Sequence, residues 1–343
     1  MPNLPAPYPS SSSNRQVSHE LAVLAALGSV VGVEIGAALG KGLFAQVPPT
    51  TAAWLRFTFA AVVLLSMRGV GAGLQRLRGR PVPPRPGLTR TAVLSALPYC
   101  LALAGMNWSF YLAIETIPLG IAVTIEYLGP LAVAIIGSRG RLDLLWAGLA
   151  GVGVALLGLR PVALDPRGVG FILVAATCWA GYITLGVRAR RHWAGADLVT
   201  MACLFGSVTL AGPAVAFGGA NLWTSGVLAM GLAVGVFSSV LPYTLDMVAF
   251  GRISPALFSI LQSLAPAVAA VAGWLLLSEV LGVTDWLALL CVVTASAGAT
   301  LSSAARVQAA GRTRQGRMSR RVRNQPSPED RPGDPAAGQP DHR

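Results

Sequence analysis

The sequence is short of charged residues, and this shortage identifies the solvent around the folded chain. Only 12% of the 343 residues are charged, whereas 54% are hydrophobic, and the mean hydropathy is +0.62. In an ordinary soluble domain about 25% of the residues carry a charge. The composition therefore excludes a typical soluble protein and indicates an integral membrane protein.

Histidine and cysteine are scarce as well, and no nucleotide-binding loop occurs. The three histidines lie outside the long apolar runs, so neither a Ser-His dyad nor a histidine metal site can form within the membrane. The four cysteines stand singly, without CxxC spacing, and are predicted to be small packing residues. The chain contains neither GxxxxGKS nor GxxxxGKT. We therefore expect no enzymatic activity, no catalytic residues, no metal and no cofactor.

The apolar runs are long and closely spaced. About 20 apolar residues are needed for a helix to cross the hydrocarbon core of a bilayer. Ten runs are predicted to be such helices: 21–40, 48–67, 91–113, 119–137, 143–160, 168–187, 198–217, 223–245, 254–277 and 283–303. The ends of the chain are rich in Pro and Ser, or in Arg, Pro and Gly, and we expect residues 1–19 and 304–343 to be flexible tails.

The cationic residues are distributed unevenly around these spans. Of the 26, 22 lie in tails and loops on one side of the membrane, and three, Lys41, Arg160 and Arg167, lie on the other. Because cytoplasmic loops are enriched in Lys and Arg, both chain ends are predicted to be cytoplasmic. A single lysine beside abundant Arg, Ala and Gly is typical of a GC-rich bacterial genome. Anionic lipid accounts for the net charge of +12, so nucleic acid is not an expected partner.

Two parts of the chain repeat each other at a constant offset. NWSFYLAIETIPLGIAVTIEYLGPLAVA aligns with YTLDMVAFGRISPALFSILQSLAPAVAA, so that Glu126 meets Gln262 and Pro130 meets Pro266. A second match joins GVEIGAALGK to WAGYITLGVR in the same order. The two matches together predict a duplicated unit of five spans.

Five is an odd number, so the second unit must enter the membrane from the opposite side. The predicted fold is therefore an all-α integral membrane protein, with ten transmembrane helices in two inverted five-helix repeats, residues 20–160 and 161–303. Inverted repeats are characteristic of secondary transporters, whose substrate site lies near the midplane between the halves. Without a phosphate-binding loop, such a transporter must be driven by an ion or substrate gradient.

Four stretches of the sequence also resemble a known family. GMNWSFYLAIETIPLGIAVTIEYLGPLAVAI, CWAGYITLGVRAR, LPYTLDMVAFGRI and WLLLSEVL are similar to EamA-type members of the drug/metabolite transporter superfamily, and the resemblance covers roughly residues 20–303. Within that superfamily the chain is most similar to bacterial inner-membrane threonine/homoserine exporters. The resemblance implies two EamA-like halves and proton-linked export of small neutral amino acids. Such exporters tend to carry an acid directly before the proline of span 9, where this chain has Ala265.

Glu126 is the residue that most needs an explanation. A charge near the centre of a membrane helix costs about 2.5–3.5 kcal/mol on insertion scales, so we expect Glu126 to face an aqueous cavity. Burial favours the protonated form of a carboxyl group, which would let Glu126 bind and release a proton. Gly129, Pro130 and Pro266 are predicted to interrupt their helices and line the cavity. The alternative is a permanently protonated Glu126 that hydrogen-bonds a neighbouring helix.

Three further ionisable residues lie within the first two spans. Glu34 and Lys41 are seven residues apart and share a helix face. Lys41 could bind the carboxylate of an amino acid, while Glu34 or Glu126 binds its ammonium group; alternatively, Lys41 extends to the outer interface. Arg56 is predicted to pair with Glu34 or with backbone carbonyls; this structural role is favoured, and contact with the substrate is the alternative.

Uncharged polar residues complete the candidate site. Asn107 and Tyr111 share one face of span 3, Tyr243 lies on span 8, and Gln262 is the counterpart of Glu126 in the second repeat. All four could hydrogen-bond a substrate. Polar side chains also hold membrane helices together, and this alternative stays open for Asn107 and Tyr243.

Three functions are consistent with these residues. The first is a proton-coupled exporter of threonine, homoserine or similar amino acids. The second is an exporter of hydrophobic cations or other small metabolites, because Glu126 suits a cation as well as an ammonium group. The third is a membrane scaffold or lipid-handling protein. The first two require a small-molecule substrate and protons as well as the bilayer, and the sequence leaves open whether the chain forms a homodimer.

Overall fold

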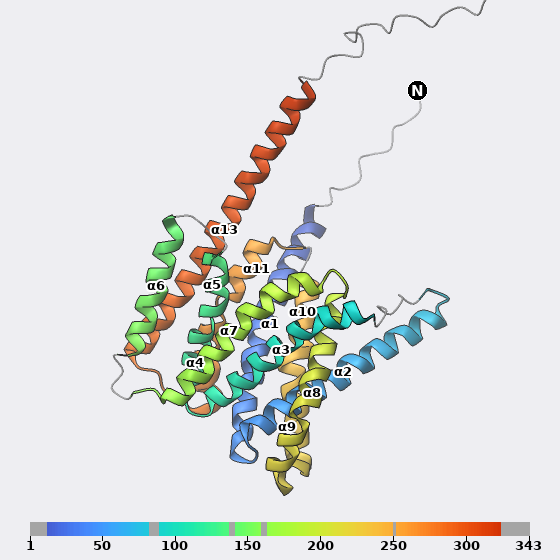
Figure 1. Cartoon of the computed structure of the whole chain (residues 1–343), viewed down its shortest axis with the longest axis vertical. Coiled ribbons are helices and arrows are strands. Elements are labelled where there is room, and N and C mark those ends of the chain that lie inside the picture. Colours follow the sequence, from blue (N-terminus) through green and yellow to red (C-terminus); the bar gives the residue numbers. More distant parts are fainter. Residues whose placement is uncertain (1–11, 82–88, 137–140, 159–162, 250–251, 324–343) are drawn as a thin grey trace, which may run out of the picture. The chain divides into compact units, whose positions relative to one another are not determined.

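The regular elements of the chain are helices (Figure 1). The computed structural model describes residues 12–81, 89–136, 141–158, 163–249 and 252–323. The helices are α1 (Ser12–Gly42), η1 (Leu43–Ala45), α2 (Pro49–Leu77), α3 (Arg90–Ile114), α4 (Leu119–Glu126), α5 (Leu128–Ile136), α6 (Arg141–Leu157), α7 (Pro166–Ala189), α8 (Gly195–Gly218), η2 (Ala220–Trp223), α9 (Ser225–Gly235), η3 (Val236–Val240), α10 (Leu241–Ala249), α11 (Pro255–Gln262), α12 (Ala265–Leu277) and α13 (Val283–Arg323).

Within the described residues, nine helical segments are long and apolar enough to cross a membrane, and α6 adds a shorter apolar helix, Leu144–Leu157. These ten correspond to the ten predicted spans. Three of the spans are each built from successive segments: α4 and α5, then α9, η3 and α10, then α11 and α12. A helix satisfies its own backbone hydrogen bonds, which water cannot do in the hydrocarbon core. The prediction of an all-α integral membrane protein is confirmed.

The helices begin at residues that suit a helix N-terminus. The hydroxyl groups of Thr89, Thr224 and Ser254 each accept a hydrogen bond from the backbone N–H three residues later. Pro49 and Pro166 occupy the first position of α2 and α7, where a missing N–H has no consequence. Short polar and proline-containing turns thus separate the apolar runs.

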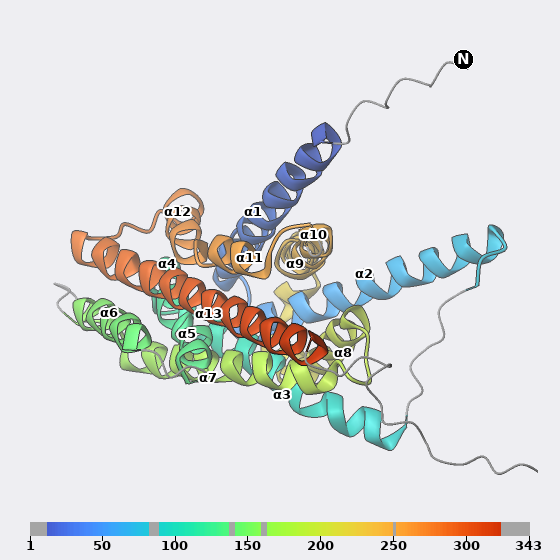
Figure 2. The ribbon, with the colours of Figure 1, turned by 90° about the horizontal axis from the view of Figure 1, so that it is seen from above.

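The two halves of the chain break their helices at equivalent positions. In the alignment that pairs Glu126 with Gln262, α4 coincides with α11, and the interruption at Tyr127 coincides with that at Ser263. The helix contacts follow the same repeat, which equates α1 with α7, and α3 with the span formed by α9, η3 and α10. The contact of α3 with α7 is therefore equivalent to that of α1 with this span, chiefly with α10, and both are extensive (Figure 2). The repeat expected from the sequence is present in the structure.

One pair of helices departs from this symmetry. α4 packs against α12 at the end of the bundle that carries Lys41, called here the Lys41 end. The equivalent pair would be α5 and α11, and the described residues of these two helices make no comparable contact. α4 and α12 are thus in contact at the Lys41 end, whereas α5 and α11 are apart at the opposite end, which carries Arg68 and is called here the Arg68 end.

The chain ends differ in part from the flexible tails expected. The chain divides into one unit of residues 1–301 and another of residues 302–343, and residues 302–323 of the second unit are helical. This stretch is rich in Ala, Arg and Gln, which are strong helix formers. The expectation of a flexible tail is therefore wrong for residues 304–323. At the other end α1 already begins at Ser12, and residues 1–11 and 324–343 lie outside the described residues.

Candidate functional site

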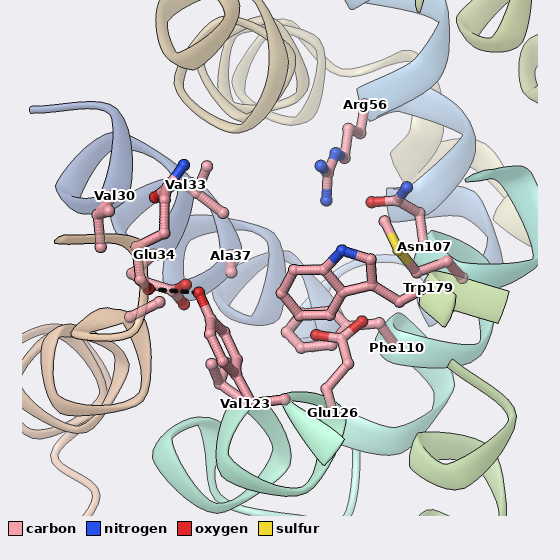
Figure 3. A pocket seen from close by; sticks show the side chains of 14 residues that line it. Val30, Val33, Glu34, Ala37, Arg56, Asn107, Phe110, Val123, Glu126 and Trp179 are labelled. Atoms are coloured by element: carbon pink, nitrogen blue, oxygen red, sulfur yellow. Dashed lines mark hydrogen bonds between the residues drawn. The ribbon is translucent and has the colours of Figure 1, made fainter. Parts of the chain in front are cut away.

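A cavity of about 220 Å³ lies where the broken spans of the two halves meet (Figure 3). Clefts for drug-sized ligands measure about 300–1,000 Å³, so this volume suits a smaller molecule. Its charged and amide side chains come from five helices: Glu34, Arg56, Asn107, Glu126 and Gln262. The rest of its wall is formed by Val30, Val33, Ala37, Met106, Phe110, Val123, Tyr127, Trp179 and Ala265. The site is a small, largely apolar cavity with a few polar groups.

The helix interruptions bring polar groups to this cavity. Glu126 is the last residue of α4, and Gln262 is the last residue of α11. Tyr127 follows Glu126, and its hydroxyl group donates a hydrogen bond of 2.5 Å to the backbone carbonyl of Gln262 (dashed line in Figure 3). The interruption of one half thus binds to the interruption of the other. Backbone groups freed within a membrane span are satisfied here by a side chain.

The two carboxyl groups of the cavity are almost fully buried. Glu34 is 4% exposed and Glu126 is 7% exposed. They are close enough to interact electrostatically with each other and with Arg56. Within the described residues, no cation lies within 4.0 Å of either carboxyl group, and Oε2 of Glu34 has no hydrogen-bond donor. Buried carboxyl groups without an ion-pair partner are suited to bind a proton or a cationic group.

Arg56 approaches the same cavity from α2. One of its guanidinium nitrogens, Nη2, donates a hydrogen bond of 3.1 Å to the backbone carbonyl of Ser238, which lies in the π-helical segment η3. The guanidinium carbon lies 5.9 Å from the centre of the Tyr111 ring, a cation–π distance. The carbonyl of Ser238 is thus its partner, rather than Glu34. A π-helical turn displaces backbone groups from their usual partners, which makes such a carbonyl available.

Lys41 does not line the cavity. Its ammonium group lies 2.7 Å from Oε1 of Glu279 and donates a hydrogen bond of 2.8 Å to the carbonyl of Ile117. The other carboxylate oxygen of Glu279 accepts a 2.7 Å hydrogen bond from the N–H of Leu119, the first residue of α4. The hypothesis that Lys41 binds the substrate in this cavity is therefore corrected: Lys41 joins α1 to the segments before α4 and after α12.

Tyr111 and Tyr243 also lie elsewhere than expected. Tyr111 is fully buried and packs against Phe44 and Phe110, behind the wall of the cavity. Tyr243 lines a second cavity, of about 950 Å³, between α2, α8 and α10. An ion pair between Arg68 and Asp197 lies in the wall of that second cavity. Both tyrosines contact the helices of the site rather than the central cavity itself.

The glycine and the two prolines expected to line the cavity do not do so. Pro130 and Pro266 lie in the first turns of α5 and α12, where proline is tolerated, and the interruptions precede them. Gly129 lies against the backbone carbonyl of Ala176 on α7, and an added Cβ would overlap that oxygen. Their roles are thus a helix start and a close helix contact, and Tyr127 reaches the cavity instead.

Trp179 and Tyr127 are cavity residues that were not predicted from the sequence. Their rings pack edge to face, with centroids 4.9 Å apart. Each lies in the middle of an apolar run, far from the interfaces where membrane aromatics usually gather. An aromatic residue in the middle of an apolar run was therefore the sequence feature that could have identified both as cavity residues.

Comparison with known proteins identifies the family of this chain. Residues 166–301 match the EamA-like transporter family. The threonine/homoserine exporter RhtA of Salmonella typhimurium (strain LT2) is 36% identical over 293 residues, which cover 84% of this chain and 95% of that protein. The chain belongs to the EamA-like transporter family. RhtA of Escherichia coli (strain K12) is 34% identical over the same extent.

A solved structure agrees with this family membership at the level of the fold. A crystal structure with 21% sequence identity matches with a TM-score of 0.52 and covers 85% of this chain and 98% of its own. The resemblance of the sequence to EamA-type transporters is confirmed, and the protein is a multi-pass membrane transporter. The segment matched by the family model, residues 166–301, lies within the predicted second repeat, residues 161–303.

Proposed function

We propose that this transporter exports threonine, homoserine or similar small neutral amino acids across a bacterial inner membrane, by proton-coupled alternating access. The central cavity carries the proposal, because it places a cation, two carboxyl groups and two amides around a volume of about 220 Å³. The RhtA proteins that the chain resembles are named as exporters of threonine and homoserine. Arg56 in the cavity wall argues against hydrophobic cations as substrates, since like charges would repel.

The charges of the cavity complement a zwitterion. An amino acid carries an anionic carboxylate and a cationic ammonium group on adjacent atoms. In Figure 3, Arg56 and Asn107 lie together on one side of the cavity, and Glu34 and Glu126 lie on other sides. Glu34 or Glu126 would bind the ammonium group, and the apolar wall around Val123 and Trp179 would surround the side chain.

The asymmetry between the helix pairs supports alternating access. We place the Lys41 end on the outer side of the membrane, because cationic residues are concentrated on the opposite side. The contact of α4 with α12 and the ion pair of Lys41 with Glu279 then close the outer end. The 950 Å³ cavity lies at the cytoplasmic end. This state would load substrate from the cytoplasm, as an exporter requires.

Glu126 is the proposed carrier of the coupled proton. In the inward-facing state, its ionised carboxylate would bind the ammonium group of the substrate. After the outer end opens, protonation of Glu126 would remove this attraction and release the substrate. The protonated protein would then return and release the proton into the cytoplasm. Each exported amino acid would thus be exchanged for a proton that enters.

Efflux from proteoliposomes tests this function. Vesicles that contain the purified protein are preloaded with labelled threonine or homoserine, with and without an imposed proton gradient. We expect gradient-driven efflux of both amino acids by the wild-type protein, and its loss in Glu126→Gln, which has nearly the same size and no titratable carboxyl group. Efflux that persists in Glu126→Gln would make Glu126 structural. The absence of efflux from well-folded wild-type protein would refute the proposed substrates.

A further inference from the structure

We propose that Arg56 is the residue that recognises the carboxylate group of the substrate, and so determines that the transporter selects amino acids rather than amines. The inference rests on the proposed amino-acid substrate and deepens it. It replaces Lys41, to which the sequence analysis assigned the carboxylate, with Arg56, for which contact with the substrate was the less favoured alternative. Three observations carry it: the other candidate cation is already paired, the guanidinium has unused donors, and it faces the small central cavity.

The first observation is which cationic side chains near the cavity are free to bind a substrate. Among the described residues, the two ion pairs within 4.0 Å are Lys41 with Glu279 and Arg68 with Asp197. Lys41 is further held by the carbonyl of Ile117. Arg56 is the cation among the residues that line the central cavity. A substrate carboxylate in this cavity therefore has Arg56 as its cationic partner.

The second observation concerns the unused donors of Arg56. A guanidinium group has five N–H donors in a planar fork, which matches the two oxygens of a carboxylate. The hydrogen bond that Arg56 donates to Ser238 uses Nη2. Nε is buried and has no acceptor within the described part of the chain. Nη1 donates no hydrogen bond to the described residues and is not enclosed in this way, so an anionic ligand could accept from it and neutralise the half-buried cation.

The third observation concerns how the guanidinium is positioned. The Ser238 carbonyl binds it on one side, and the Tyr111 ring lies 5.9 Å away. Figure 3 shows the guanidinium directed into the cavity, with the amide of Asn107 beside it. The side chain is thus oriented before a ligand arrives, which lowers the entropy cost of binding. Glu34 and Glu126 remain for the ammonium group.

A purely structural Arg56 would have a different signature. Its contact with Ser238 in η3 would hold α2 against the π-helical turn, and its removal would weaken transport of every substrate equally. A carboxylate-binding Arg56 changes affinity only for molecules that carry a carboxylate. Substrate analogues therefore distinguish the two roles, because they change the ligand and leave the protein fold intact.

The experiment measures equilibrium binding of labelled threonine to the protein in proteoliposomes, and its competition by unlabelled threonine, threoninol and 3-hydroxybutyrate. Binding can also be measured in variants that do not transport. Threoninol replaces the carboxylate with a hydroxymethyl group, and 3-hydroxybutyrate lacks the amino group. In the wild-type protein we expect threonine to bind roughly 10- to 100-fold more tightly than threoninol, the effect of one charged hydrogen-bonding pair. In Arg56→Gln the threonine-to-threoninol ratio should fall to about one, while the ratio of threonine to 3-hydroxybutyrate stays unchanged.

Two controls make the result specific. Arg68→Gln removes an arginine from the same helix, α2, and should leave both ratios unchanged. Glu126→Gln should change the ratio that reports on the amino group and preserve the ratio that reports on the carboxylate. If Arg56→Gln does not assemble, Arg56→Lys replaces it, and a lower threonine-to-threoninol ratio is again the expected result.

The outcomes separate this inference from the function on which it rests. A wild-type protein that does not transport threonine refutes the proposed function. A wild-type protein that transports threonine but binds threoninol equally well refutes only the role of Arg56, whatever the variants do. An unchanged threonine-to-threoninol ratio in a folded Arg56 variant refutes it as well.

Discussion

The ion pair of Lys41 with Glu279 should determine how often the Lys41 end of the transporter, which we propose to be the outer end, opens. Lys41 belongs to α1, and Glu279 follows α12 and accepts a hydrogen bond from the first residue of α4. These contacts join segments from both halves of the chain. Glu279→Gln keeps the size of the side chain and an oxygen that can accept from Leu119, but it removes the charge that faces Lys41. We expect this variant to favour the outward-open state.

The expected magnitude follows from the burial of the pair. The side chains of Lys41 and Glu279 are 18% and 14% exposed. Exposed ion pairs contribute about 0–1 kcal/mol, and loss of one partner from a fully buried pair costs about 3–5 kcal/mol. A largely buried pair should lie between these limits, at about 2–3 kcal/mol. At about 1.4 kcal/mol for each tenfold change, the ratio of open to closed molecules should rise roughly 30- to 140-fold.

The assay is labelling by a membrane-impermeant thiol reagent applied from the outer side. Ala37 lines the cavity, is buried, and precedes Lys41 by one helical turn on α1. Ala37→Cys, in a background without the four native cysteines, should react slowly when Glu279 is present. In Glu279→Gln the labelling rate of this cysteine should rise by up to roughly 140-fold, the upper limit estimated above for the ratio of open to closed molecules.

Two further substitutions complete this test. Asp197→Asn, which breaks the ion pair with Arg68 at the opposite end, serves as the matched control and should not increase the rate from outside. Lys41→Gln, combined with Glu279→Gln, should restore part of the slow labelling, because it removes the unpaired ammonium group. An equal labelling rate with and without Glu279→Gln would refute the reasoning.

Glycine substitutions provide two further predictions. Gly120→Ala would place a Cβ 2.8 Å from the Cα of Ala270, so α4 and α12 must separate; labelling of the Ala37→Cys background from outside should accelerate, and an unchanged rate would contradict this reading of the contact. In α8, Gly206→Ala would place a Cβ 2.7 Å from the ring of Phe57 and should destabilise the protein by about 1–3 kcal/mol, whereas Gly212→Ala meets no atom within 4 Å and should stabilise it by about 0.5–1 kcal/mol. Thermal unfolding in detergent measures both, and the prediction fails if the two variants shift the Tm in the same direction.

The spans and the repeat could be predicted from the sequence because their causes are local. A run of about 20 apolar residues is sufficient to predict a membrane helix, whatever the rest of the chain does. The correspondence between Glu126 and Gln262 was visible in the residues themselves, and the structure places both at the ends of equivalent short helices. Glu34 and Glu126 were selected because an isolated carboxylate is costly in a membrane, and both line the cavity.

A backbone carbonyl was one of the partners predicted for Arg56, but neither Ser238 itself nor the partner of Lys41 could be predicted, because both lie in distant parts of the chain. Lys41, in the first span, pairs with Glu279, which follows the ninth span, and Arg56 binds a backbone carbonyl of Ser238. A backbone carbonyl freed by a π-helical turn has no sequence signature. The interruption at Tyr127 was likewise attributed to Gly129 and Pro130, although proline in a first turn does not break a helix.

α4 contacts α12, whereas α5 and α11 make no comparable contact. This difference predicts the contacts of the opposite transport state. If each half adopts the arrangement now held by the other, the alignment of the two repeats predicts the contacts of the opposite state. The positions equivalent to Gly120 and Ala270 are Ala256 and Ala134, on α11 and α5. Small residues thus stand at both pairs of positions, where two backbones must approach closely. Cysteines at positions 134 and 256 should therefore cross-link when the outer end is open, and cysteines at positions 120 and 270 when it is closed.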